Sequence, residues 1–306
     1  MRVGWRIVFS SSEDLTRASR AKVAEPAFVS WVSAAAESLF ATLFPADCRL
    51  CGAPLVKISR LPVCEDCLTA VKPVEGIVCA KCGERLAIQS HLPEGGGLLC
   101  CSDCRQEPPV FAKALAYGSY SGGLRDLIHL LKYQQVKPAA AVLGRMLAEV
   151  IEELAPSLDG IVPVIVPVPL HPSKLRQRGF NQSEMIAAAA AKLKPGGLEL
   201  AIRAHLLERR RPTGSQTGLS EHQRQENMRG AFSLSRPDEV DGCDVLLVDD
   251  VFTTGATVSE CARVLRRAGV PRVWVATVAR TMKTEVVHAV LRAEPDEEMQ
   301  SMAAHG

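Results

Sequence analysis

Aromatic residues are scarce in this sequence: Phe, Trp and Tyr together account for 5% of its 306 residues, whereas hydrophobic residues account for 47%. Such a balance is typical of a soluble protein whose sheet packs through aliphatic side chains. A strong net charge is lacking too, because 36 Lys and Arg stand against 34 Asp and Glu, which leaves +2. The overall charge therefore predicts no particular partner.

Long hydrophobic runs are also missing. The best candidate for a membrane span, residues 26–45, is a short amphipathic stretch that contains Glu37, so we expect no span. The first residues do not have the pattern of a signal peptide, because Arg6 interrupts their apolar run. A cytoplasmic location fits these absences best.

Cysteine is concentrated in one region, since nine of the eleven cysteines lie between Cys48 and Cys104. They form one C-x2-C-x12-C-x2-C pattern and one C-x2-C-x18-C-x2-C pattern. Four thiolates at such spacing are typical of a zinc ribbon, in which a fully coordinated Zn²⁺ has a structural role. The sequence therefore predicts two structural Zn²⁺ sites, with these ligands: Cys48, Cys51, Cys64 and Cys67; Cys79, Cys82, Cys101 and Cys104.

Two points stay open for the cysteines: which group they bind, and which residues bind it. Four thiolates can also hold an iron–sulfur cluster instead of zinc. Disulfides do not suit the expected compartment. Cys100 lies next to Cys101 and is an alternative ligand in the second set. Cys243 and Cys261 are isolated, and we expect both to be core residues.

Hydrophobic patterns divide the chain into four parts: a disordered extension (1–26), an amphipathic helix followed by the double zinc ribbon (27–108), an α/β domain (109–283) and a tail (284–306). In the α/β domain, apolar runs and helical periodicity alternate along the chain. This order predicts a parallel sheet flanked by helices. The expected strands are 112–120, 161–169, 245–248 and 272–278, and the expected helices are 124–132, 139–154, 181–192 and 256–268.

The segment VLLVDDVFTTGAT, residues 245–257, carries the most information about chemistry. Asp249 and Asp250 end a buried strand, at the edge of the sheet where ligands bind in open α/β folds. A turn, Thr253–Thr254–Gly255, then opens a helix whose free N–H groups suit a phosphate. Carboxylates repel phosphate but accept hydrogen bonds from vicinal hydroxyls. The segment therefore predicts a site for a sugar phosphate, although Asp and Thr also serve as helix caps.

Positive charge gathers elsewhere in the α/β domain. Between His171 and Arg229 there are eleven Lys or Arg against five Glu and no Asp, which suits pyrophosphate or nucleic acid. Lys174, Arg176 and Arg178 occupy alternate positions after an expected strand. In an extended loop they would point the same way, towards a pyrophosphate. Lys132 ends an expected helix, where either the helix dipole or a ligand accounts for it.

The segment 245–257 resembles the motif of type I phosphoribosyltransferases that binds phosphoribosyl pyrophosphate (PRPP). This resemblance implies that Asp249 and Asp250 hold the ribose hydroxyls. It implies that the 5'-phosphate lies on Thr253, Thr254, Gly255, Ala256 and Thr257. It also implies that PRPP binds together with Mg²⁺.

Three further stretches, YSGGLRDLIHLLKY (120–133), PVPLHPSKLRQRGFNQSE (167–184) and RRRPTGSQTGLSEHQRQENMRGAF (209–232), resemble the ComF family. With the cysteines, the resemblance covers residues 28–280. It implies a type I phosphoribosyltransferase fold with a small N-terminal double zinc-ribbon module, and an association with DNA uptake in natural competence. Residues 209–227 correspond to the loop that closes over PRPP, with polar residues Thr213, Gln216, Arg224 and Asn227.

Three functions remain open from the sequence. The first is a phosphoribosyltransferase that releases pyrophosphate and transfers ribose 5-phosphate to an unknown acceptor. The second is a protein of DNA uptake that holds single-stranded DNA with its zinc ribbons and basic loop, although the ribbons lack the aromatic residues of a stacking platform. The third is an adaptor whose ribbons contact a helicase or another partner.

Overall fold

The computed structural model describes residues 46–55, 59–86, 98–211, 221–240 and 242–283. The expectations for the extension 1–26, for the amphipathic helix, for Thr213 and Gln216 and for the tail lie outside these residues. The chain divides into two compact units, and one of them, residues 1–46 and 55–58, is almost entirely outside the described residues. All the elements below belong to the other unit.

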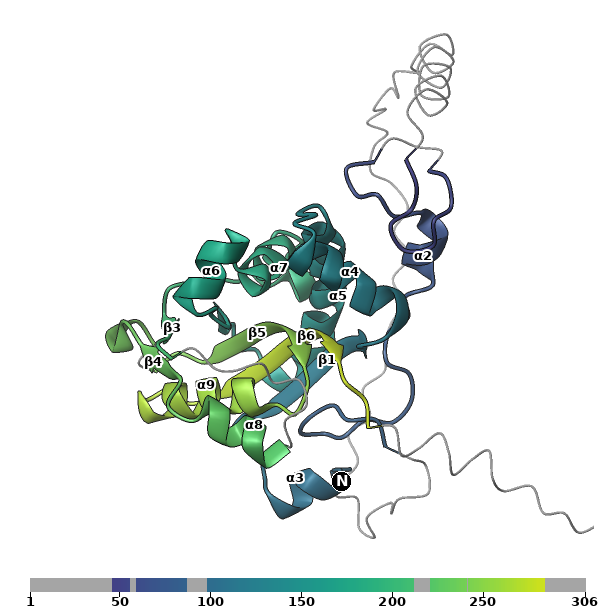
Figure 1. Ribbon diagram of the computed structural model, residues 1–306. Helices are drawn as coiled ribbons and strands as arrows, with labels where there is room; N and C mark the ends of the chain where they lie inside the picture. The colour runs from purple at the N-terminus through teal and green to yellow at the C-terminus, as the bar shows by residue number, and fades with distance from the viewer. Residues whose placement is uncertain (1–45, 56–58, 87–97, 212–220, 241, 284–306) are drawn as a thin grey trace, which may run out of the picture. The chain divides into compact units, whose positions relative to one another are not determined.

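Four parallel strands form the central sheet (Figure 1). Their order across the sheet is β1 (Lys113–Ser119), β6 (Val273–Arg280), β5 (Val245–Phe252) and β2 (Val164–Pro167). Every residue of β6 is buried, as expected of a central strand that is covered on both faces. The predicted parallel sheet is confirmed.

Helices cover both faces of the sheet (Figure 1). Helices α5 (Ala139–Leu154) and α7 (Gln182–Ala191) pack together and against the sheet, and α4 (Gly122–Tyr133) lies on α5. Helix α9 (Ala256–Arg267) covers β5 and β6. The remaining elements in the described part of the chain are short: α2 (Glu65–Thr69), α3 (Ser102–Gln106), α6 (Pro172–Arg178), α8 (Glu221–Met228), β3 (Leu207–Arg209), β4 (Phe232–Leu234) and the 3₁₀ turns Ala155–Leu158, Pro195–Gly197 and Pro237–Glu239.

The strands differ from the expectation in two places. The apolar run 161–169 pairs only over Val164–Pro167, because its prolines supply no N–H to a ladder. Strand β5 is longer than expected and continues through both aspartates to Phe252. The bounds of α5 are those predicted. Asn181 caps α7, since its Oδ1 accepts a hydrogen bond from the N–H of Ser183.

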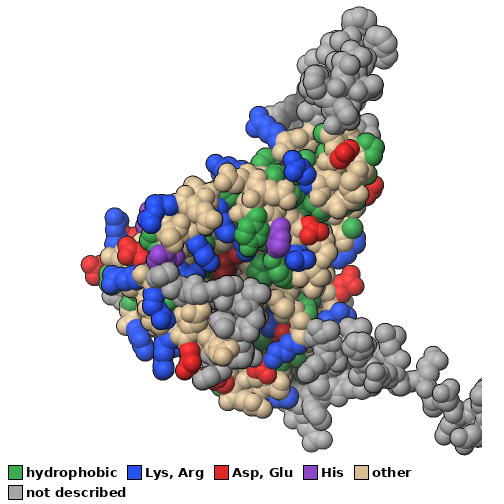
Figure 2. Space-filling model, viewed as in Figure 1, with side chains coloured by type: hydrophobic (Ala, Val, Ile, Leu, Met, Phe, Trp, Pro, Cys, Tyr) green, Lys and Arg blue, Asp and Glu red, His purple; other side chains and the backbone are tan. Residues whose placement is uncertain are grey.

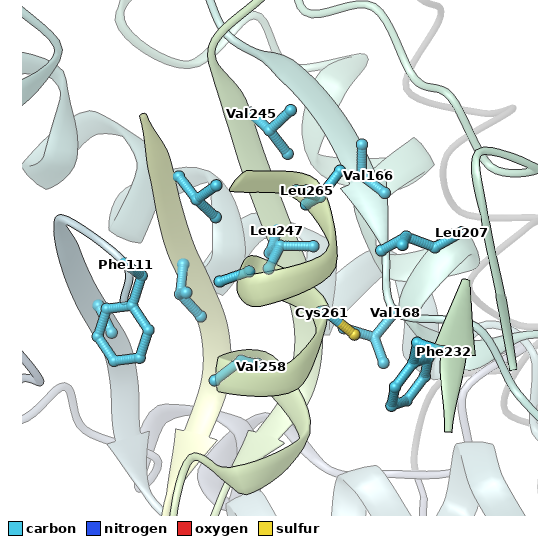
Figure 3. Close-up of a cluster of buried hydrophobic side chains, with 14 of the residues drawn as sticks. Phe111, Val166, Val168, Leu207, Phe232, Val245, Leu247, Val258, Cys261 and Leu265 are labelled. Atoms are coloured by element: carbon cyan, nitrogen blue, oxygen red, sulfur yellow. The ribbon is translucent and has the colours of Figure 1, made fainter. Parts of the chain in front are cut away.

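One hydrophobic cluster joins the sheet to α9 (Figure 3), and it extends to the second cysteine set. Phe111, Leu247 and Cys261 are members, and so are the proposed zinc ligands Cys79 and Cys82. The expectation of a core position is confirmed for Cys261, which is fully buried. The expectation is wrong for Cys243, which lies in the loop before β5 and is partly exposed.

A search of the described residues for a helix with the length and hydrophobicity of a membrane span finds none. The stretch 26–45, the best candidate from the sequence, lies outside these residues.

Gly144 of α5 lies at the contact with α7, so a substitution there tests how closely the two helices pack. A Cβ at this position would lie 2.4 Å from Cβ of Ala189, so the helices are too close for any side chain. We expect Gly144→Ala to lower the free energy of unfolding by about 1–3 kcal/mol, although alanine is favoured over glycine in a helix by about 1 kcal/mol. Denaturant titration measures the change. Arg145→Ala, at the adjacent exposed position, is the matched control, and a stabilised Gly144→Ala protein would contradict the packing.

Candidate nucleotide site and metal centres

The paired carboxylates lie at the carboxyl end of β5, where α4 and α7 also place side chains. Asp250 is buried and forms an ion pair with Lys132 at the end of α4. Its Oδ1 accepts a hydrogen bond from Gln182 Nε2 at 3.4 Å. Lys132 therefore reaches the site, where it neutralises one of the two carboxylates.

Asp249 has a different environment. Its Oδ1 accepts hydrogen bonds from Ser183 Oγ and from the backbone N–H of Asp250, both at 2.9 Å. Burial and the adjacent charge of Asp250 raise the pKa of Asp249 to about 7. At neutral pH this carboxyl is therefore poised between its protonated and ionised forms.

The ion pair shifts both of its members towards their charged forms. Burial opposes the charge of Asp250, but the Lys132 ammonium outweighs burial and lowers the pKa of Asp250. Burial likewise opposes the charge of Lys132, but attraction to Asp250 prevails and raises the pKa of Lys132. The two neighbouring aspartates thus have pKa values displaced in opposite directions.

A group of cations stands beside the carboxylates. Partial burial lowers the pKa of Lys174, and the positive charges of Arg209, Arg178 and Lys132 lower it further, because each of them repels the Lys174 ammonium. Arg178 also binds Gln182, the residue that contacts Asp250. Positive charges held together in this way provide a place for a polyanion.

The expected extended loop at 172–178 is wrong, because this segment is the helix α6, with His171 as its N-cap and Pro172 at its first position. Residues four apart share a helix face, whereas residues two apart point about 200° away from each other. Lys174 and Arg178 therefore remain together. Arg176 is exposed on another side of α6 and does not join them.

Residues 253–257, for which the sequence predicts a phosphate site and which we call the phosphate loop, connect β5 to α9. Gly255 has φ +78°, and a Cβ there would lie 2.6 Å from the ring of Phe252, so only glycine fits. Ala256 and Thr257 begin α9, whose first N–H groups face this turn. Among the described residues, the Oγ1 of Thr254 is one of a few buried side-chain atoms that have no hydrogen-bond partner. A bound phosphate would supply that partner.

A cavity of about 460 Å³ borders this loop. Thr253 and Thr254 line it on one side and the residues around Cys82 and Glu84 on another. Arg224 of α8 also lines it, so the structure places Arg224 near the loop rather than with Lys174 and Arg178.

Three members of the site were not expected from the sequence: Gln182, Ser183 and Arg209. The signal for Gln182 and Ser183 is their position, because they start a helix just after a buried strand that ends at the same sheet edge as β5. Arg209 lies on β3, in a segment that reads as a polar loop. Nothing in the local pattern separates it from Arg210 and Arg211.

The cysteines form two groups, and in each of them the four Sγ atoms lie within 4.8 Å of one another. Sulfurs about 2.3 Å from one tetrahedral Zn²⁺ would be about 3.8 Å apart. The measured pairs Cys48–Cys67, Cys51–Cys64 and Cys82–Cys101 are separated by 3.9, 3.7 and 3.7 Å. Both groups therefore fit Zn²⁺, and Cys101 rather than Cys100 completes the second.

The backbone makes the same turn in the two centres. The N–H of Gly52 bonds to the carbonyl of Cys48, and the N–H of Gly83 bonds to the carbonyl of Cys79. Both glycines have positive φ, +74° and +72°, which lets the chain wrap around a metal.

Two family models match the chain: the double zinc ribbon domain over residues 39–105 and the phosphoribosyl transferase domain over residues 186–293. The chain is 34% identical over 239 residues to the DNA utilization protein YhgH of Salmonella typhi, which covers 78% of this chain and 98% of that protein. It is 28% identical over 225 residues to competence protein F of Haemophilus influenzae, which covers 73% and 92% respectively.

A solved structure of hypoxanthine phosphoribosyltransferase from Staphylococcus aureus is 16% identical, covers 45% of this chain and 62% of that chain, and has a TM-score of 0.31. That likeness carries no argument of its own. The parallel sheet, the phosphate loop and the family models define a protein with a type I phosphoribosyltransferase domain and a double zinc ribbon. The chain belongs to the ComF family, together with YhgH and competence protein F.

Zinc content tests the ligand assignment. We expect the wild type and Cys100→Ser to hold two zinc ions per chain, and Cys101→Ser to hold one, because only Cys101 closes the second tetrahedron. Native mass spectrometry counts the ions, with Cys243→Ser as a control outside both groups. Loss of a zinc ion from Cys100→Ser would reverse the assignment.

Isosteric substitution of the two aspartates tests the electrostatics. The raised pKa of Asp249 means that the folded state binds this proton more tightly than the unfolded state, so stability falls as pH rises from about 4 to about 7. Asp249→Asn removes the penalty, and at pH 8 we expect it to be more stable than wild type by about 1–3 kcal/mol. The gain should vanish near pH 4.

Asp250→Asn is the opposite case. It leaves Lys132 buried without its counter-ion, so we expect a loss of about 3 kcal/mol at neutral pH. Denaturant unfolding across the pH range measures both variants. Changes of the same sign at pH 8 would contradict the assigned environments.

Proposed function

We propose that this protein binds PRPP with Mg²⁺ and transfers its ribose 5-phosphate to an acceptor with release of pyrophosphate. The observation that carries the proposal is the convergence of three different groups at one sheet edge. A phosphate loop, a carboxylate pair and a cluster of cations match the three parts of PRPP: phosphate, ribose and pyrophosphate.

Each part has its own residues in this proposal. The 5'-phosphate lies on residues 253–257, where it accepts hydrogen bonds from the first N–H groups of α9 and from Thr254 Oγ1. The ribose hydroxyls donate to Asp249 and Asp250. The pyrophosphate lies against Lys174 and against Arg178 and Arg209, whose positive charges act on Lys174.

Mg²⁺ fits the donor set, because it prefers oxygen ligands and binds through one or two carboxylates together with substrate phosphates. Asp249 and Asp250 would hold it from the protein side, and it would neutralise charge on the pyrophosphate. Ionised Asp249 is the better ligand, and a bound cation favours that form.

In the reaction, the C1–O bond to pyrophosphate breaks and a bond from C1 to the acceptor nucleophile forms. The charge that develops on the departing pyrophosphate is stabilised by cations that are already in place. Such a site needs no single essential base at C1.

A second candidate function is the binding of single-stranded DNA, and one of the relatives is named a DNA utilization protein. Tyr133 is 69% exposed, Arg178 lies 5.7 Å from its ring and His129 meets it edge-on at 5.1 Å. Lys137 lies over Phe180 at 5.7 Å. Figure 2 shows hydrophobic side chains beside a histidine, with Lys and Arg side chains on either side. Aromatic rings among cations suit stacked bases, and here they come from the α/β domain rather than from the ribbons.

Calorimetric titration of the zinc-loaded protein with PRPP and Mg²⁺ tests the proposal. We expect saturable binding that Arg178→Ala weakens roughly 10- to 100-fold, since hydrogen bonds to charged groups contribute about 1.5–3 kcal/mol. Arg176→Ala is the matched control and should bind as wild type does, because Arg176 is directed away from the site. Pyrophosphate release with added nucleobases then tests transfer.

If the folded wild type does not bind PRPP, the enzyme proposal is wrong. A labelled oligonucleotide added to the same protein then tests the second candidate by anisotropy.

A further inference from the structure

One buried arginine connects the second zinc centre with the phosphate loop. Arg280, the last residue of β6, is 5% exposed. Its Nε donates to Glu84 Oε2 at 3.0 Å, and its guanidinium also binds the carbonyl of Cys82. One of its nitrogens lies 3.7 Å from Cys82 Sγ, so it touches a zinc ligand directly.

The other side of the same guanidinium meets the loop. Arg280 lies over the ring of Phe252 at 4.5 Å, and Phe252 directly precedes Thr253. Phe111 holds that ring edge-on at 6.2 Å. The ring in turn occupies the space that a Cβ on Gly255 would need. The position of the ring and the backbone of the loop therefore constrain each other.

We infer that Arg280 is a positioning residue through which zinc at the second centre orders the phosphate loop. Zinc holds Cys82 in place, and Cys82 and Glu84 together hold the guanidinium of Arg280. The guanidinium in turn holds the ring of Phe252, and with it the turn that follows. If zinc leaves, Cys82 is freed and the loop loses this support. The effect is reciprocal, because a ligand that orders the loop must also favour zinc at this centre.

The first zinc centre lacks this connection within the described residues. The cluster that contains Cys79 and Cys82 includes no residue of 47–67. Cys51 is exposed. The first centre meets the start of α4, where a Cβ on Gly123 would lie 3.6 Å from the carbonyl oxygen of Cys67, and Arg49 bonds to Gln134 at 3.4 Å, but neither contact involves the phosphate loop. The inference therefore concerns one centre of the two, and the other provides an internal control.

Hydrogen exchange of the loop tests the inference. The paired variant Arg280→Met/Glu84→Gln removes both buried charges together, so that neither is left without a partner. We expect amides of residues 252–257 to exchange roughly five- to thirtyfold faster than in the wild type. Amides of α5, which are bonded within that helix, should keep their wild-type protection. Cys51→Ser, which breaks the first centre, should leave the loop unchanged.

A conservative variant separates the two roles of the guanidinium. Arg280→Lys keeps a charge for Glu84 but has no planar group to lie over Phe252. We expect it to retain two zinc ions by native mass spectrometry and still to show fast loop exchange. Loop exchange equal to wild type in both Arg280 variants would overturn the inference. Equal acceleration in the loop and in α5 would also overturn it, because Arg280 would then be merely structural.

A second measurement covers failure of these variants to fold. In Cys51→Ser protein, which retains the second centre, removal of the remaining zinc by a chelator should accelerate loop exchange by the same factor. Unchanged exchange would again overturn the inference. None of these measurements requires PRPP. Absence of PRPP binding would therefore sink the proposed function alone, whereas slower zinc release in the presence of PRPP would show that the loop ligand and the metal are linked.

Discussion

Two adjacent carboxylates at the buried end of β5 impose the strongest constraint on this structure. Burial and mutual repulsion both oppose their charges, and the two carboxylates are stabilised by different neighbours. Asp250 receives the ammonium of Lys132 from the end of α4, whereas Asp249 receives the hydroxyl of Ser183 from the start of α7. Two helices distant in the sequence are thus tied to one strand, and the site costs stability that the surrounding packing must offset.

The zinc ribbons depend on metal ligation rather than on a hydrophobic core. A segment rich in Cys, Gly and Pro buries too little apolar surface to fold by itself, and metal ligation supplies the missing free energy. The two ribbons use the same turn around the metal, yet they differ in their surroundings. The first buries Leu61 and Val63 locally, and the second merges into the core beside β1 and β6.

Hydrophobic periodicity predicted the long helices well, because a long segment repeats its apolar pattern several times. The bounds of α5 follow from sixteen residues with one apolar face, and the zinc ligands follow from spacing alone. The strand, the turn and the helix of residues 245–267 were predicted equally well, because the local signals for all three agree there. Local pattern and global fold coincide at these positions.

Prediction failed where tertiary contacts decide. Segment 172–178 is too short to show a helical period. The alternate spacing of Lys174, Arg176 and Arg178 predicts one shared side, which the helix α6 does not give them. The strand β3 has three residues, and its pairing with β4 depends on a segment more than twenty residues away. The roles of Ser183 and Arg209 depend on their distance from Asp249, which no local pattern encodes.

The pairing of Glu84 with Arg280 joins residues 196 positions apart. During synthesis the first ribbon can close around its metal as soon as it leaves the ribosome, because its ligands span twenty residues. The second ribbon has its cysteines almost as early, but Glu84 must wait for nearly the whole domain before its partner exists. Contacts of such long range form late and slowly. Until then Glu84 has to stay hydrated, so the second ribbon can close early but dock only when the last strand of the sheet is added.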